Sequence, residues 1–376
     1  MGVTAGRQGD ESMSNQQVSM FNNDKSKNLK LVFNSGAINA SDLKKILIKD
    51  LGWNQAEIDS STITKSIDPH VTDACDHECT HCWASIDGKH MQIDTFRNVL
   101  LLAHAAGVGS IQFSGGEPTL NKKIIEMAEL SKASGFNNTL RTHGRFLGKV
   151  FNQNNGKTWA NEISRTFDEV FVSIDGLARS NFEMRPVKIG MKSIGKIYTE
   201  GDLVKINEVA QKQFDETMAG YIALNDSIMG SSTKLKINTV VARANVHDIA
   251  RFGEYLSLRV KEGNFKVDNW DLTQVFPSNG VKVNEPFLIE EEEFFSAIGL
   301  ASLESANIPK RAKPRTWARC LVVEQDGKTY FGGGQRFELG NVNNCNVSEC
   351  SDKIDEYSAF WENSHRDVQQ YLVYKP

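Results

Sequence analysis

The sequence has no long apolar run, only 8 prolines and no excess of basic residues. Its longest apolar stretch, around residues 99–108, is interrupted by His104 and falls far short of the roughly 20 residues that a membrane-spanning helix needs. The 43 basic and 47 acidic side chains give a net charge of -4, which argues against binding of nucleic acid through its phosphates. Residues 1–30 lack the apolar core of a secretion signal and are rich in small polar residues, which predicts a disordered leader. We therefore expect a cytoplasmic protein with neither a membrane nor a nucleic-acid partner.

The rest of the chain has the composition of a globular protein. Its 376 residues are 40% hydrophobic and 24% charged, enough for one large domain with an appendage. Apolar strand patterns alternate with helix patterns, which favours parallel pairing and an α/β fold. The predicted strands cover residues 69–72, 110–113, 138–142, 170–174, 234–241 and 270–276. Six strands are too few for an eight-stranded barrel, so we predict a partial, open (β/α)6 TIM-like barrel.

The spacing of these elements suggests the domain organisation. An N-terminal extension over residues 31–68 precedes the barrel, which is expected at 69–278. The gap between the fourth and fifth strands is nearly twice as long as a βαβ unit requires, which predicts an insertion near 184–230. Its glycines, Gly201 and Gly220 among them, indicate irregular segments around one helix near 203–218. Residues 279–376 form a C-terminal extension.

Three of the six cysteines, Cys75, Cys79 and Cys82, lie within eight residues of one another. In a large chain without an export signal, such a cluster indicates a metal site in a reducing compartment rather than disulfides. A structural zinc site would need a fourth ligand, for which His77 or His81 is available. A [4Fe-4S] cluster normally takes four thiolates, so three would leave one iron open to a substrate or cofactor.

The cysteine segment, residues 74–83 (ACDHECTHCW), resembles the CxxxCxxC signature of the radical S-adenosylmethionine (SAM) enzymes. Two more segments support the resemblance in the expected order: residues 115–118 (GGEP) are similar to the motif that meets the SAM amino group, and residues 236–241 to the fifth strand. Ser173 to Gly176 followed by Arg185 resembles the "SxDG...R" element of the subgroup that holds the molybdenum-cofactor GTP cyclase and the SPASM-domain enzymes. The resemblance covers about residues 68–278.

The resemblance implies that Cys75, Cys79 and Cys82 hold a [4Fe-4S] cluster that reductively cleaves SAM to a 5'-deoxyadenosyl radical. A flavodoxin- or ferredoxin-type reductant would supply the electron. The residues expected to contact SAM are His81, Gly115, Gly116, Glu117, Ser173, Arg185 and Asn238. No catalytic residue is assigned, although His143 follows the tip of the third strand. Since active groups of barrel folds gather at the carboxyl ends of the parallel strands, these residues are expected on one rim, together with Thr142, Asp175 and Gln274.

The other three cysteines, Cys320, Cys345 and Cys350, lie in a segment that resembles a twitch or SPASM cap. Residues 325–330 resemble its hairpin and residues 339–342 its "LGN" element, but Gly332 replaces a cysteine of the full pattern. The three thiols could bind a second, auxiliary [4Fe-4S] cluster, remain free and buried, or form a zinc site.

The main functional hypothesis is a radical SAM enzyme that abstracts hydrogen from a small polar metabolite, such as a nucleotide or a sugar. The first 68 residues contain no recognisable domain for binding a peptide leader, which favours a small molecule. A ribosomal-peptide maturase of the SPASM type is the alternative enzyme. An iron-sulfur electron carrier or sensor without catalysis is the alternative of another class.

Overall fold

The computed structural model describes residues 66–344 apart from 83, 85, 153–155, 188–199, 264, 276–286, 314–320 and 332–336. The predictions for the leader, for most of the N-terminal extension and for Cys320, Cys345 and Cys350 fall outside the described residues.

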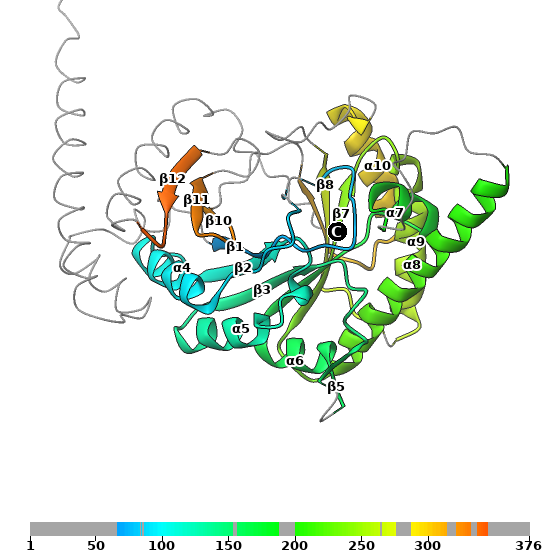
Figure 1. Cartoon of the computed structure of the whole chain (residues 1–376). Coiled ribbons are helices and arrows are strands. Elements are labelled where there is room, and N and C mark those ends of the chain that lie inside the picture. Colours follow the sequence, from blue (N-terminus) through cyan, green and yellow to red (C-terminus); the bar gives the residue numbers. More distant parts are fainter. Residues whose placement is uncertain are drawn as a thin grey trace, which may run out of the picture.

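A ten-stranded sheet forms the centre of the described structure, in the order β12-β11-β10-β1-β2-β3-β6-β7-β8-β9 (Figure 1). Its strands are β1 (Ser66–Thr72), β2 (Ser110–Gly115), β3 (Asn137–Thr142), β6 (Glu169–Ser173), β7 (Lys234–Val241), β8 (Asn269–Gln274), β9 (Lys310–Lys313), β10 (Leu321–Val323), β11 (Lys328–Phe331) and β12 (Phe337–Asn341). All pairs from β10 through β1 to β9 are parallel, whereas β10, β11 and β12 form an antiparallel meander. The α/β prediction and the positions of its six strands are confirmed.

The helices connect successive parallel strands and cover the convex face of the sheet (Figure 1). The α-helices are α4 (Ile93–Ala105), α5 (Ile124–Ala133), α6 (Trp159–Thr166), α7 (Ala178–Met184), α8 (Glu200–Ser227), α9 (Ile249–Lys261) and α10 (Glu291–Glu304). Short elements complete the set: the 3-10 helices η1 (Pro118–Leu120) and η2 (Val246–Asp248), and the hairpin of β4 (Val150–Asn152) and β5 (Lys157–Thr158). Among the described helices, none is long and apolar enough to cross a lipid bilayer.

The two faces of the sheet differ in polarity. On β2, the buried Ile111 and Phe113 face the helices and belong to the main hydrophobic core, together with Phe96 of α4. Alternate residues, such as Gln112 on the same strand, point to the opposite, concave face, because successive side chains of a strand point to opposite sides. The apolar strand residues therefore hold the helices, and the concave face is free to carry polar groups.

The crossover between β6 and β7 contains the predicted helix near 203–218, but that helix is longer than predicted. Helix α8 is 28 residues long and packs against α6 and α7, so most of the predicted insertion is an extended crossover helix. Gly201 and Gly220 lie inside this helix rather than in irregular segments. Gly220 has a packing reason, because a Cβ there would lie 2.0 Å from the carbonyl oxygen of Gly144. A glycine in this pattern therefore marks a close approach of the helix to the β3–α6 loop, and not a break.

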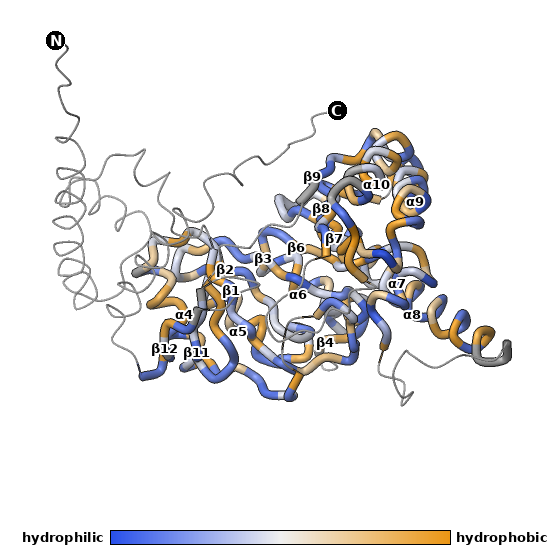
Figure 2. Tube along the Cα trace, turned by 90° about the horizontal axis from the view of Figure 1, so that it is seen from above, coloured by the Kyte–Doolittle hydropathy of each residue, from blue (hydrophilic) through white to orange (hydrophobic). Residues whose placement is uncertain are grey.

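The described parts of the C-terminal segment extend the sheet at both of its edges. Strand β9 pairs with β8, and β10 pairs with β1 in parallel. The predicted hairpin at residues 325–330 is confirmed, since β10 and β11 pair in antiparallel fashion around Gly327. Figure 2 shows β11 and β12 at one end of the molecule and the adjacent helices α9 and α10 at the other.

Candidate functional site

The cysteine segment is a loop that follows β1 at the carboxyl edge of the sheet. Its backbone is tied to the end of α7 and the residues that follow: Glu78 N donates to Pro186 O (2.8 Å), and Thr80 N donates to Met184 O (3.1 Å). An isolated bridge joins His77 to the same segment. Two parts of the chain more than a hundred residues apart thus fix the shape of this loop.

The three cysteines of the loop are free thiols of intermediate exposure. Burial raises the pKa of the Cys75 thiol to about 12, and burial also raises the pKa values of Cys79 and Cys82. Each ionised sulfur would raise the pKa of its neighbours further, which places the three thiols within electrostatic reach of one another. Partly buried thiols with raised pKa values are suited to a cationic iron centre, which would replace the thiol protons.

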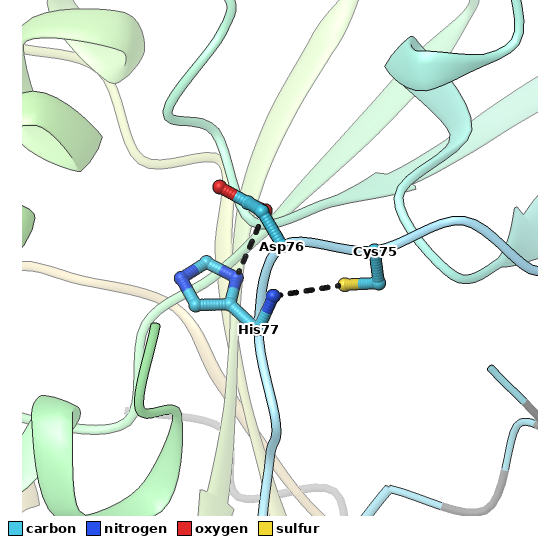
Figure 3. A group of neighbouring side chains, drawn as sticks. All are labelled: Cys75, Asp76 and His77. Atoms are coloured by element: carbon cyan, nitrogen blue, oxygen red, sulfur yellow. Dashed lines mark hydrogen bonds and ion pairs between the residues drawn. The ribbon is translucent and has the colours of Figure 1, made fainter. Parts of the chain in front are cut away.

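The side chains beside Cys75 point away from its sulfur. The ligand atoms of Cys75, Asp76 and His77 lie within 4.8 Å of one another, but Figure 3 shows the carboxylate and the imidazole on the other side of the loop from the Cys75 sulfur. The His77 ring instead contacts Gln213 Nε2 at 3.0 Å and packs edge-on against the ring of His143. The imidazole of His77 is therefore engaged by Gln213 and His143, which argues against a zinc site completed by His77.

Residues 115–118 form the tight turn that the GGEP motif predicts. Gly115 has φ of +112°, and a Cβ at Gly115 or Gly116 would lie 2.3 Å from Thr72 O or 2.2 Å from Ala74 O, respectively. The same closeness allows Gly116 N to donate to Thr72 O (2.6 Å) and Glu117 N to donate to Ala74 O (2.8 Å). The two glycines thus let the turn lie directly against the start of the cysteine loop.

The Glu117 side chain is 1% exposed, and four donors occupy its carboxylate. Oε1 accepts from Thr119 N (3.1 Å), Thr119 Oγ1 (2.6 Å) and Thr142 Oγ1 (2.7 Å), and Oε2 accepts from His143 N (2.9 Å). These bonds join the turn after β2 to the tip of β3. In this structure Glu117 therefore links two neighbouring rim segments, and its predicted contact with SAM stays a prediction.

Arg185 connects the end of β6 to the cysteine loop. Its Nε lies 2.6 Å from Asp175 Oδ2, and its Nη1 lies 3.9 Å from Cys79 Sγ. Asp175 is fully buried and also accepts a bond from Val240 N (2.7 Å). His81 Nε2 is 3.7 Å from the same carboxylate, and burial lowers the pKa of His81 to about 4, so its imidazole is neutral near pH 7.

Three other predicted rim residues lie on β6, β7 and β8. Ser173 and Asn238 are register partners on β6 and β7, both partly exposed on the concave face. Gln274 is buried and donates to Ile289 O (2.9 Å) on the other side of β8. Of the predicted rim set, the structure therefore gathers Cys75, Gly115, Glu117, Thr142 and Asp175 around the loop and turns Gln274 away.

An ionic network behind the loop escaped the sequence reasoning. Asp76 Oδ1 lies 2.8 Å from His143 Nε2, and Asp76 Oδ2 lies 2.5 Å from Arg145 Nη1. Arg145 Nε also donates to Glu216 Oε2 (2.9 Å), which connects the loop to α8. Asp76 lies within the cysteine segment and His143 follows the third strand, but Arg145 and Glu216 belong to no motif, so nothing in the sequence indicates that the four residues interact.

A row of cationic and aromatic side chains on the concave face was also not predicted. Arg141, Phe171 and Lys236 are register neighbours on β3, β6 and β7. The Arg141 guanidinium carbon lies 4.8 Å and Lys236 Nζ 5.0 Å from the centre of the Phe171 ring. Arg141 also donates to Gln112 Oε1 (2.9 Å), and Lys236 pairs with Glu169 (2.8 Å). The concave face next to the rim thus carries two cations on either side of an aromatic ring.

Comparisons with known proteins place this geometry in a family. Residues 70–226 match the Radical SAM superfamily. An "S-adenosylmethionine-dependent nucleotide dehydratase" of Lacinutrix mariniflava is 28% identical over 286 residues, which cover 73% of this chain and 51% of that protein. A "GTP 3',8-cyclase" of Paracoccus denitrificans is 30% identical over 164 residues, covering 39% of this chain and 44% of that protein. The chain thus spans about half the length of these two curated relatives.

The fold is similar to that of a solved structure. The structure described as "Native anSMEcpe with bound AdoMet and Cp18Cys peptide" superposes with a TM-score of 0.51 at 18% identity, covering 78% of this chain and 81% of that one. This similarity confirms the predicted partial barrel. Residues 70–226 therefore match the domain of the Radical SAM superfamily, whose enzymes use a [4Fe-4S] cluster and S-adenosylmethionine.

Proposed function

We propose that this protein is a radical SAM enzyme that abstracts a hydrogen atom from a nucleotide-like small molecule. The row formed by Arg141, Phe171 and Lys236 carries the substrate part of the proposal. A nucleotide offers anionic phosphates, which two neighbouring cations complement. The Phe171 ring is only 4% exposed, so its part is to hold the two cations side by side rather than to stack on a base. The names of the dehydratase and cyclase relatives, both of which refer to nucleotides, support the same substrate class.

The residues around the loop fit the cofactors of this chemistry. Cys75, Cys79 and Cys82 would hold the cluster, and the Gly115–Gly116 backbone, His81, Ser173, Arg185 and Asn238 would line the SAM site. When bound, the cluster would supply one electron to SAM, and SAM would supply the carbon-centred radical that this electron generates. A flavodoxin- or ferredoxin-type protein is the proposed electron donor.

The remaining contribution of the chain is to position the reactants. The turn at Gly115 and Gly116 and the segment at Arg185 both bond to the cysteine loop, so they bring the β2 and β6 rims toward the same centre. Arg141 and Lys236 would orient an anionic substrate on the concave face below that centre. Holding the reacting groups in line lowers the barrier because the entropy of alignment is lost on binding, before the reaction.

The direct test measures 5'-deoxyadenosine. We would reconstitute the full chain with iron and sulfide without oxygen, add SAM and dithionite, and compare ribonucleoside mono-, di- and triphosphates with a peptide library. We expect a particular nucleotide to raise 5'-deoxyadenosine formation above the substrate-free level and to be converted. Cys79→Ala should abolish the product.

Matched variants test the substrate row. Arg141→Gln and Lys236→Met should each raise the KM for the nucleotide by about tenfold or more, because each variant removes one charge-assisted contact with the substrate. Arg251→Gln and Lys261→Met remove exposed cations of α9 and should leave the KM unchanged. Stimulation by peptides and by none of the nucleotides would refute the proposed substrate class.

A further inference from the structure

We propose that Arg185 tunes the reduction potential of the cluster held by Cys75, Cys79 and Cys82. This role goes beyond a contact with SAM, and it acts even in the absence of SAM. It rests on the cluster of the proposed function but not on the proposed substrate.

The Arg185 guanidinium lies between a cluster ligand and a buried carboxylate. Nη1 points to Cys79 Sγ at 3.9 Å, while Nε lies 2.6 Å and Nη2 3.3 Å from the oxygens of Asp175. Arg185 is 11% exposed and Asp175 is fully buried, so water screens their charges little. The fork geometry of the guanidinium lets it serve the sulfur and the carboxylate together.

The backbone around Arg185 is fixed against the same loop. Met184 O and Pro186 O, on either side of it, accept bonds from Thr80 N and Glu78 N of the cysteine loop. The carbonyl oxygen of Arg185 accepts a bond from Gln213 Nε2 (2.7 Å). The guanidinium is therefore held at the sulfur by the fold and needs no ligand to bring it there.

Reduction adds one electron to the cluster, and thus one negative charge, without changing its atoms. A nearby positive charge and an N–H group directed at a ligand sulfur stabilise the more negative state. Arg185 should therefore make the potential less negative. Asp175 should act in the opposite direction, because its carboxylate partly neutralises Arg185.

The test is a redox titration of the reconstituted full chain without SAM, followed by electron paramagnetic resonance of the reduced cluster. At a fixed potential, Arg185→Gln should lower the reduction equilibrium constant about tenfold, a shift of about 59 mV to more negative potential for one electron. Asp175→Asn should shift the potential the other way. Arg185→Lys, which keeps the charge, should lie between the wild type and Arg185→Gln.

Arg179→Gln is the matched control, because Arg179 is an exposed arginine of α7 that pairs with Glu183. It should leave the potential unchanged. Equal SAM-free potentials in wild type, Arg185→Gln and Asp175→Asn, with a change only in SAM affinity, would overturn the proposal. If Arg185→Gln holds no cluster, the other two variants still test the proposal. Asp175→Asn should make the potential less negative than in the wild type, and Arg185→Lys should make it more negative. A wild type that takes up no cluster would refute the proposed function itself, whereas loss of nucleotide turnover alone would leave this proposal standing.

Discussion

Replacing Glu117 by Gln keeps the shape of the side chain but removes two things at once, its charge and one acceptor. In the structure the carboxylate accepts four hydrogen bonds, from Thr119, Thr142 and His143, at 1% exposure. A glutamine whose oxygen takes the place of Oε1 would present its amide N–H groups to His143 N, itself a donor. The chain would then lose one bond to a charged acceptor and leave a buried donor without a partner.

The expected cost follows from those contacts. A hydrogen bond to a charged group contributes about 1.5–3 kcal/mol, and the three remaining bonds weaken when their acceptor becomes neutral. We expect Glu117→Gln to lower the free energy of unfolding by about 2–4 kcal/mol. With a urea m value of about 3 kcal/mol/M, the unfolding midpoint would fall by about 1 M.

The assay is urea unfolding of the chain without iron and SAM, followed by circular dichroism. Glu126→Gln, an exposed substitution on α5, is the control and should change the stability by less than about 0.5 kcal/mol. If Glu117→Gln were as stable as the wild type without SAM and lost only SAM affinity, then Glu117 would act as a ligand. The reasoning that it holds the β2 and β3 rims together would be wrong.

Three further predictions test other parts of the chain. Gly220→Ala places a Cβ 2.0 Å from Gly144 O and should destabilise the protein by about 1–3 kcal/mol. Gly299→Ala in α10, where a Cβ would have nothing within 4 Å, should stabilise it by about 0.5–1 kcal/mol. Equal thermal midpoints for the two variants would contradict the packing argument. Burial against Phe136 lowers the pKa of His104 below its usual 6.5, so the unfolded chain takes up a proton more readily and stability should fall as the pH drops below about 6.5. His104→Leu should flatten the dependence of stability on pH in that range, and an unchanged pH dependence would contradict the role given to His104. For the C-terminal cysteines, reconstituted chain should contain about eight iron atoms with an auxiliary cluster and about four without one, and a Cys345→Ala, Cys350→Ala double variant with unchanged iron content and spectra would exclude the auxiliary cluster.

The features that the sequence predicted well are local ones. The strand patterns at residues 110–113 and 170–174 and the glycines at 115 and 116 each depend on a few neighbouring residues, whose periodicity or spacing reflects the backbone directly. The cysteine spacing is equally local. These signals were enough to predict the parallel sheet and the loop on its rim.

The features that the sequence did not predict depend on contacts between distant, isolated residues. Asp76 and Arg145 form an ion pair although they are 69 residues apart in the sequence. Arg141 lies beside Phe171 only because β3 and β6 pair in this register. A single charged residue has no spacing pattern that reveals its partner. Gly220 could not be interpreted from the sequence for a similar reason. A glycine can mark either a break in a helix or a close packing contact, and only the position of Gly144 in the folded chain distinguishes the two.

The pairing of β10 with β1 has a consequence for the order of folding. β1 leads into the cysteine loop, yet its neighbour on one side comes from Leu321–Val323, about 250 residues later in the chain. During synthesis β1 can pair with β2 early, but among the described strands its other edge has no partner until β10 emerges, and exposed edges invite pairing with other chains. The β10–β12 meander thus covers the edge of the strand that leads into the cysteine loop. A chain interrupted before residue 321 would present that edge to its neighbours and be prone to aggregate.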